Sequence, residues 1–142
     1  MGFRIGIPLF AAAFVADLAS KAAAVDGHAH VYFHDVPSRL PNRLVAILLA
    51  LLVTAALTRI SARRRDLGRP WGAWVGAPLL TAGILANGVS SLLWHRGVPD
   101  FIWTGDSIMN VADFEIFFGI VGGLAALFVG YCVTYSREAL TR

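Results

Sequence analysis

Acidic residues and cysteine are scarce in this chain, and each scarcity limits what the protein can be. The single cysteine, Cys132, cannot form a disulfide within the chain. Only nine of the 142 residues are acidic, and none lies between Asp66 and Asp100. Hydrophobic residues make up 57% of the chain and the mean hydropathy is +0.66, both too high for a soluble domain of this length. Because these residues form blocks long enough to cross a bilayer, the sequence predicts one integral membrane domain.

Four apolar blocks predict an all-α fold with four transmembrane helices in a single domain over residues 1–142. At about 1.5 Å per residue, some twenty helical residues cross the roughly 30 Å hydrocarbon core. The first block follows a short basic start, as in a secretory signal peptide, but Asp17 and Lys21 interrupt it, so we expect a retained helix. Gly72-x-x-x-Gly76 and Gly119-x-x-x-Gly123 predict close packing between helices. The predicted spans are roughly residues 5–24, 43–60, 71–93 and 111–135.

The basic residues predict how the helices are oriented. The net charge of +3 would suit nucleic-acid binding, but the basic residues cluster in short segments between apolar blocks, as topology signals do. Eight of the twelve fall on one side of the predicted membrane, which is then the cytoplasmic side: Arg4, Arg59, Arg63, Arg64, Arg65, Arg69, Arg137 and Arg142. Both termini are therefore expected in the cytoplasm, while residues 25–42 and 95–109 form two short outward-facing segments. We expect the protein to contact membrane lipids and to bind no nucleic acid.

The motif Asn110-Val-Ala-Asp113 at the start of the last apolar block is the most informative one. A carboxyl group at the edge of a membrane helix is costly, so it is a candidate for a functional site. Asn110 is a favourable N-cap, and Asp113 lies in the first turn, where the helix dipole favours negative charge. Glu115 lies about 200° around the helix from Asp113, so we expect it to point toward another helix, a connecting segment or the headgroups.

Three further motifs precede it along the chain. In Asp17-x-x-x-Lys21 the two charged residues share one helix face, so we expect an ion pair, with the lysine able to reach the headgroups. Asn87-Gly-Val-Ser90 lies near the end of the third apolar block. Val98-Pro-Asp100-Phe101 lies in the second outward segment.

Together these four motifs resemble those of bacterial lipoprotein signal peptidase (signal peptidase II), an aspartic peptidase that cuts prolipoproteins inside the membrane with two aspartates. The resemblance covers the four-helix plan and most of the chain. It implies the bacterial inner membrane as location, Asp113 as a catalytic aspartate and no cofactor. It further implies supporting or binding roles for Asp17, Lys21, Asn87, Asp100 and Asn110.

Two features depart from the family pattern. Aligning Asn87 with the asparagine of the family's Asn-x-x-Asp-Arg motif puts Ser90 at the aspartate and Ser91 at the arginine, with one inserted residue before Asp100. A gapless alignment anchored on Asp100 gives Gly88, Ser91 and Leu92 at these positions instead, and neither alignment supplies an acid. We therefore interpret Ser90 as the position of a missing catalytic aspartate. In addition, only about eighteen residues separate the first two spans, and they lack the Asn-x-Gly-x-Ala-Phe motif with which the family helps to hold its substrate.

The missing acid determines the functional interpretation. A serine hydroxyl does not titrate near neutral pH, and a positioned acid–base group typically contributes about 10²–10⁴-fold in rate. We therefore predict a catalytically disabled pseudoenzyme, which binds a lipidated polypeptide or serves as an accessory subunit of a larger membrane complex. Asp113 should then face Ser90 or Ser91 across a polar pocket, with no second carboxyl group in direct contact. The alternative is a divergent, active prolipoprotein peptidase in which Asp100 or Asp106 replaces the missing acid.

The histidines suggest a more distant alternative, an outward metal-binding membrane protein. His28, His30 and His34 would point the same way in a strand, as zinc or copper ligands do. The alternating pattern of this segment is compatible with a short strand on the membrane surface. Because the sequence fixes no fourth protein ligand, we favour a solvated segment or a partner interface as the explanation for the histidines.

Overall fold

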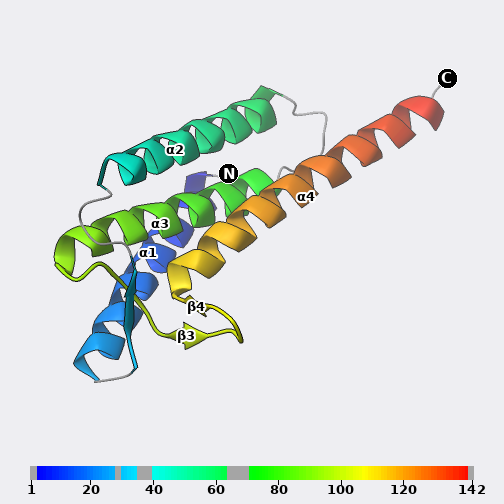
Figure 1. Ribbon diagram of the computed structural model, residues 1–142. Coiled ribbons are helices and arrows are strands. Elements are labelled where there is room, and N and C mark those ends of the chain that lie inside the picture. The colour runs from blue at the N-terminus through cyan, green and yellow to red at the C-terminus, as the bar shows by residue number, and fades with distance from the viewer. Residues whose placement is uncertain (1–2, 28–29, 35–39, 64–70, 141–142) are drawn as a thin grey trace.

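Four helices dominate the computed structural model, which describes residues 3–27, 30–34, 40–63 and 71–140 (Figure 1). They are α1 (Phe3–Asp26), α2 (Leu40–Arg63), α3 (Trp71–Leu93) and α4 (Val111–Leu140). The bounds of α3 are those predicted from its apolar block. The other helices are longer than predicted, and α4 continues to Leu140, so that its C-terminal part extends beyond the other helices.

The membrane prediction is confirmed in its general form. Within the described part of the chain, three helices are long and apolar enough to cross a membrane: Ile5–Asp26, Trp74–Leu93 and Val111–Leu140. In α2 the corresponding apolar stretch covers Ile47–Ala56, which is shorter, so a fourth span stays a prediction. Large apolar side chains such as Leu52 and Phe128 are exposed, as expected for residues that face lipid.

α3 is the central helix, and the other three helices all pack against it (Figure 1). Its buried face consists largely of small residues, including Ala77, Ala82 and Ala86. The closest approach is to α4: a Cβ added at Gly76 would lie 2.7 Å from the carbonyl oxygen of Gly119 and 2.9 Å from the nitrogen of Gly123. The predicted glycine-mediated packing is therefore confirmed for Gly76, Gly119 and Gly123, because only glycine lets the two backbones come this close.

The two connecting segments described in the structure meet at one end of the helices and form small sheets (Figure 1). In the first segment, β1 (Tyr32–His34) pairs antiparallel with β2 (Val98–Asp100) of the second, with His34 opposite Val98 and Tyr32 opposite Asp100. β3 (Ile102–Trp103) and β4 (Ile108–Met109) form a hairpin. The expected short strand is confirmed for Tyr32–His34, whereas strands in the second segment were not predicted. The all-α prediction thus holds for the long apolar helices and not for the connections.

Glycine conformations allow the second segment to turn tightly. Gly97, just before β2, has a φ of 115°, and Gly105, between β3 and β4, has a φ of 79°. Residues with a side chain rarely adopt these values. The turns carry the chain from the end of α3 to the start of α4 and place Asp100 and Asn110 close to each other.

Candidate functional site

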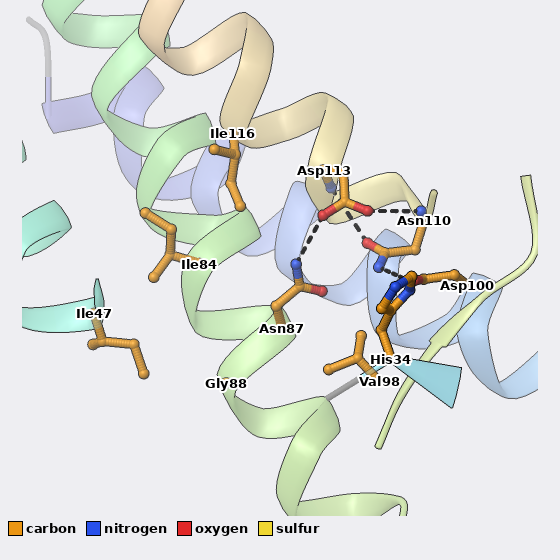
Figure 2. A pocket seen from close by; sticks show the side chains of 10 residues that line it. All are labelled: His34, Ile47, Ile84, Asn87, Gly88, Val98, Asp100, Asn110, Asp113 and Ile116. Atoms are coloured by element: carbon orange, nitrogen blue, oxygen red, sulfur yellow. Dashed lines mark hydrogen bonds and ion pairs between the residues drawn. The ribbon is translucent and has the colours of Figure 1, made fainter. Parts of the chain in front are cut away.

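A partly open cavity of about 220 Å³ lies where α2, α3, α4, β1 and β2 come together (Figure 2). One part of its wall is apolar, and the other part carries amides, carboxyl groups and an imidazole. We call it the inner cavity. Its lining residues are His34, Ile47, Ile84, Asn87, Gly88, Val98, Asp100, Asn110, Asp113 and Ile116.

Asp113 is held at the cavity by two amide donors. Its Oδ1 accepts a hydrogen bond from Asn87 Nδ2 at 3.1 Å, and its Oδ2 accepts one from the backbone N–H of Asn110 at 3.0 Å (Figure 2). In return, the N–H of Asp113 donates to Asn110 Oδ1 at 3.3 Å. This reciprocal arrangement satisfies N–H groups that a helix start would otherwise leave open. The predicted N-cap at Asn110 is confirmed, and the cap also fixes the carboxyl group of Asp113.

Asp100 reaches the same cavity from β2. Its side chain is only 6% exposed. One carboxyl oxygen, Oδ1, accepts a hydrogen bond from Asn110 Nδ2, and the other, Oδ2, lies 2.7 Å from His34 Nδ1. Asn110 therefore joins the two acids, since its side-chain amide bonds to Asp100 and its backbone bonds to Asp113 (Figure 2).

The predicted ion pair between Asp17 and Lys21 is confirmed, but both side chains are fully buried. Lys21 Nζ lies 2.7 Å from Asp17 Oδ2 and donates at 2.7 Å to Asn87 Oδ1. The expectation that Lys21 could extend to the headgroups is therefore wrong, because its ammonium group is turned into the bundle. With its oxygen occupied by Lys21, the Asn87 amide must direct its NH₂ group toward Asp113, and this fixes its orientation.

Asp17 also supports the start of α4 directly. Its second oxygen, Oδ1, accepts the backbone N–H of Ala112 at 2.8 Å. An anionic group at a helix N-terminus is favourable because the open N–H groups there carry partial positive charge. A continuous set of hydrogen bonds thus connects α1, α3 and α4 behind the inner cavity.

The expectation that Asp113 faces Ser90 or Ser91 is wrong. Ser90 Oγ donates to the carbonyl oxygen of Ala86 at 2.6 Å and Ser91 Oγ to that of Gly88 at 2.7 Å. Serine in a helix commonly bonds in this way to its own backbone. Neither serine lines the inner cavity, and Asn87 takes the place next to Asp113 that was predicted for them.

A second, larger depression lies outside the first. It has a volume of about 700 Å³ and is lined by Tyr32, His34, Asp100, Asp106, Ser107, Ile108, Met109 and Asp113. We call it the outer hollow. It shares His34, Asp100 and Asp113 with the inner cavity, so the two carboxyl groups lie where the two spaces adjoin. Asp106 is exposed and lines only the outer hollow.

Glu115 lies outside both spaces, as its position on the helix predicted. It is 7% exposed, and a Cβ added at Gly83 would lie 3.1 Å from Glu115 Cβ, so it faces α3. Its Oε2 is buried without a hydrogen-bond partner among the described residues.

The histidines are not brought together in the described part of the chain. His34 bonds to Asp100, while His30 is exposed and precedes β1. His28 lies outside the described residues. Among the residues that the structure describes, no group of three or more histidine, cysteine or acidic residues could hold a metal ion.

No protein-family model matches this chain, and comparisons with curated proteins and with solved structures gave no match.

Proposed function

We propose that this protein is a membrane-embedded aspartic endopeptidase of the signal peptidase II type, with Asp100 and Asp113 as its pair of acids. The observation that carries the proposal is their joint attachment to Asn110 at the wall of one cavity. The prediction of a disabled enzyme rested on the lack of an acid at Ser90. Asp100 supplies a second carboxyl group from another element, so the alternative in which Asp100 replaces the missing acid has the stronger support.

The hydrogen bonds assign different roles to the two acids. Both oxygens of Asp113 accept hydrogen bonds from N–H groups, so neither oxygen has a partner that could accept a proton from this carboxyl group. Asp100 Oδ2 faces an imidazole nitrogen, which can either donate or accept a hydrogen bond, so a proton on this oxygen has an acceptor. We therefore assign Asp113 as the base and Asp100 as the acid that donates a proton, with Asn110 linking the two carboxyl groups.

The reaction follows from these roles. Asp113 removes a proton from a water molecule, and the water oxygen forms a bond to the scissile carbonyl carbon. Asp100 donates its proton to the carbonyl oxygen, which gives a neutral tetrahedral intermediate. Collapse of this intermediate breaks the C–N bond: the leaving nitrogen takes up the proton held by Asp113, and one hydroxyl group of the intermediate returns its proton to Asp100. The products are a carboxylic acid and an amine.

The apolar wall of the inner cavity suits the substrate of such an enzyme. Ile47, Ile84 and Ile116 come from three different helices and adjoin the polar wall (Figure 2). An apolar stretch of a membrane-inserted polypeptide can pack against these side chains while its peptide bond reaches the acids. Together with the sequence motifs, this favours a prolipoprotein signal peptide as substrate. The connecting segments that form the sheets would face outward from the bacterial inner membrane, with both termini in the cytoplasm.

The test is cleavage of a diacylglyceryl-modified prolipoprotein by purified protein in detergent. Wild type should cleave, and Asp100→Asn and Asp113→Asn should each lose about 10²–10⁴-fold in rate, because each removes one positioned acid–base group. Asp106→Asn is the matched control and should retain activity, since Asp106 is exposed and does not line the inner cavity.

The competing function is the pseudoenzyme. It is favoured by the short first connection, which leaves little chain to hold a substrate. A wild-type protein that binds the prolipoprotein or a membrane subunit without cleavage, and an Asp113→Asn variant that behaves alike, would replace the peptidase proposal with this binding role.

A further inference from the structure

We propose that His34 is a positioning residue for Asp100, which orients its carboxyl group and passes a proton between Asp100 Oδ2 and the outer hollow. This inference deepens the proposed peptidase function and rests on it. None of the four sequence motifs contains His34.

The strand register brings the imidazole to Asp100. In the β1–β2 pair, His34 lies opposite Val98 and Tyr32 opposite Asp100, so His34 is a diagonal neighbour of Asp100 on the sheet. Long side chains reach such diagonal neighbours. The Tyr32 ring contacts the imidazole edge-on, with the ring centroids 4.9 Å apart. The resulting distance from His34 Nδ1 to Asp100 Oδ2 is 2.7 Å.

His34 also connects a buried group to an open space. The His34 side chain is 58% exposed, whereas the Asp100 side chain is 6% exposed. His34 lines the outer hollow as well as the inner cavity. A proton that His34 takes up from solvent at the outer hollow therefore has a direct hydrogen bond along which to reach Asp100.

The hydrogen-bond partners of the four carboxyl oxygens indicate that Asp100 Oδ2 is the position where a proton is exchanged. Asp113 Oδ1 and Oδ2 and Asp100 Oδ1 are each bonded to an amide N–H, which can only donate. Only Asp100 Oδ2 faces a group that can both donate and accept a proton, the imidazole of His34. At the end of a turnover Asp113 has given its proton to the leaving nitrogen, and the hydroxyl proton of the intermediate has returned to Asp100. His34 lets Asp100 exchange that proton with the outer hollow between turnovers, so that the acid is protonated when the next substrate binds.

The other ionisable groups near His34 come from several elements. Tyr32 lies beside it on β1, Asp100 on β2, Asp113 on α4, and Asp106 between β3 and β4 also lines the outer hollow. Arg96 is engaged over the ring of Phe33, 4.4 Å from its centroid. Adjacent strand residues point to opposite faces, so Phe33 and Arg96 lie on the other side of β1 from His34.

The principal test is His34→Asn, because its amide can approach Asp100 from nearly the position of Nδ1 but cannot exchange a proton. We expect kcat to fall on the order of 10²-fold with little change in KM, and the pH dependence of kcat to differ from that of the wild type. His30→Asn is the matched control, since His30 is exposed and outside the sheet, and it should keep the wild-type pH profile. If His34→Asn does not fold, His34→Gln takes its place in the same assay.

A spectroscopic measurement tests the contact without relying on activity. In protein with ¹⁵N-labelled histidine, the Nδ1 resonance of His34 should shift in Asp100→Asn and stay unchanged in Asp26→Asn, since Asp26 is exposed and lines neither space. An unchanged resonance in Asp100→Asn overturns the inference. A wild-type protein that cleaves, together with a His34→Asn variant of equal kcat and pH profile, also overturns it and leaves the proposed function standing. A wild-type protein without cleavage overturns both.

Discussion

Replacing Lys21 with methionine should destabilise the protein far more than removing an exposed basic side chain. The Lys21 ammonium is fully buried and bonds to Asp17 Oδ2 and Asn87 Oδ1. Methionine retains most of the volume but leaves both oxygens without this partner. Breaking a buried ion pair from one side typically costs about 3–5 kcal/mol, because the remaining charge is uncompensated. We expect a loss of that size in the free energy of unfolding, measured reversibly in mixed detergent micelles.

The pairing with Asp17 can be isolated with a second variant. Asp17→Asn removes the charge but can keep an oxygen for the N–H of Ala112. The double variant Asp17→Asn/Lys21→Met should therefore be more stable than the sum of the two single losses implies. The control is Arg96→Met, where an exposed cation over an aromatic ring contributes only about 0.5–1 kcal/mol. Equal losses for Lys21→Met and Arg96→Met, or strict additivity in the double variant, would refute the buried pair.

Three other predictions concern packing, a buried acid and orientation. Gly119→Ala should lower the free energy of unfolding by about 1–3 kcal/mol, because the added Cβ would lie 2.6 Å from the nitrogen of Leu80. A Cβ at Gly122 meets nothing within 4 Å, so the control Gly122→Ala should be near neutral in the same unfolding assay. Glu115→Gln should leave cleavage unchanged and should leave thermal stability unchanged or raise it. Burying a neutral amide costs less than burying a charged carboxyl group whose Oε2 has no hydrogen-bond partner among the described residues. A large loss of stability would mean that Glu115 has an essential ionic partner. With Cys132 replaced by serine, a cysteine at Gly27 should be labelled from outside intact cells and one at Ser61 should not, and the opposite pattern would reverse the proposed orientation.

Local sequence patterns predicted the helices and the capped N-terminus of α4 well, because both depend on residues that are close in sequence. The apolar block of residues 71–93 coincides with α3. The spacing in Asn110-Val-Ala-Asp113 suffices to predict a helix start, and the reciprocal hydrogen bonds are present. The i,i+4 spacing of Asp17 and Lys21 likewise predicted their ion pair. The burial of that pair was not predictable, since it depends on how α1 packs against α3 and α4.

The second acid could not be assigned from local patterns. Asp100 comes to the inner cavity because β2 pairs with β1, and its partner His34 is 66 positions away in the sequence. Strand pairing over that separation leaves no local signal in a single sequence. The motif alignment placed the second acid at Ser90, whose hydroxyl bonds within its own helix. The sequence named Asp100 and Asp106 alike as replacements for that acid, and the hydrogen bond from Asn110 to Asp100 distinguishes them in the structure.

The central claim, that Asp100 and Asp113 work as one catalytic pair, is tested most directly by combining their substitutions. The measurement is the single-turnover rate of prolipoprotein cleavage by wild type, Asp100→Asn, Asp113→Asn and the double variant. Residues that act as a unit are strongly non-additive, so we expect each single variant to lose about 10²–10⁴-fold and the double variant to lose little more than either. Rate losses that multiply in the double variant, or a single variant with wild-type activity, would contradict the claim.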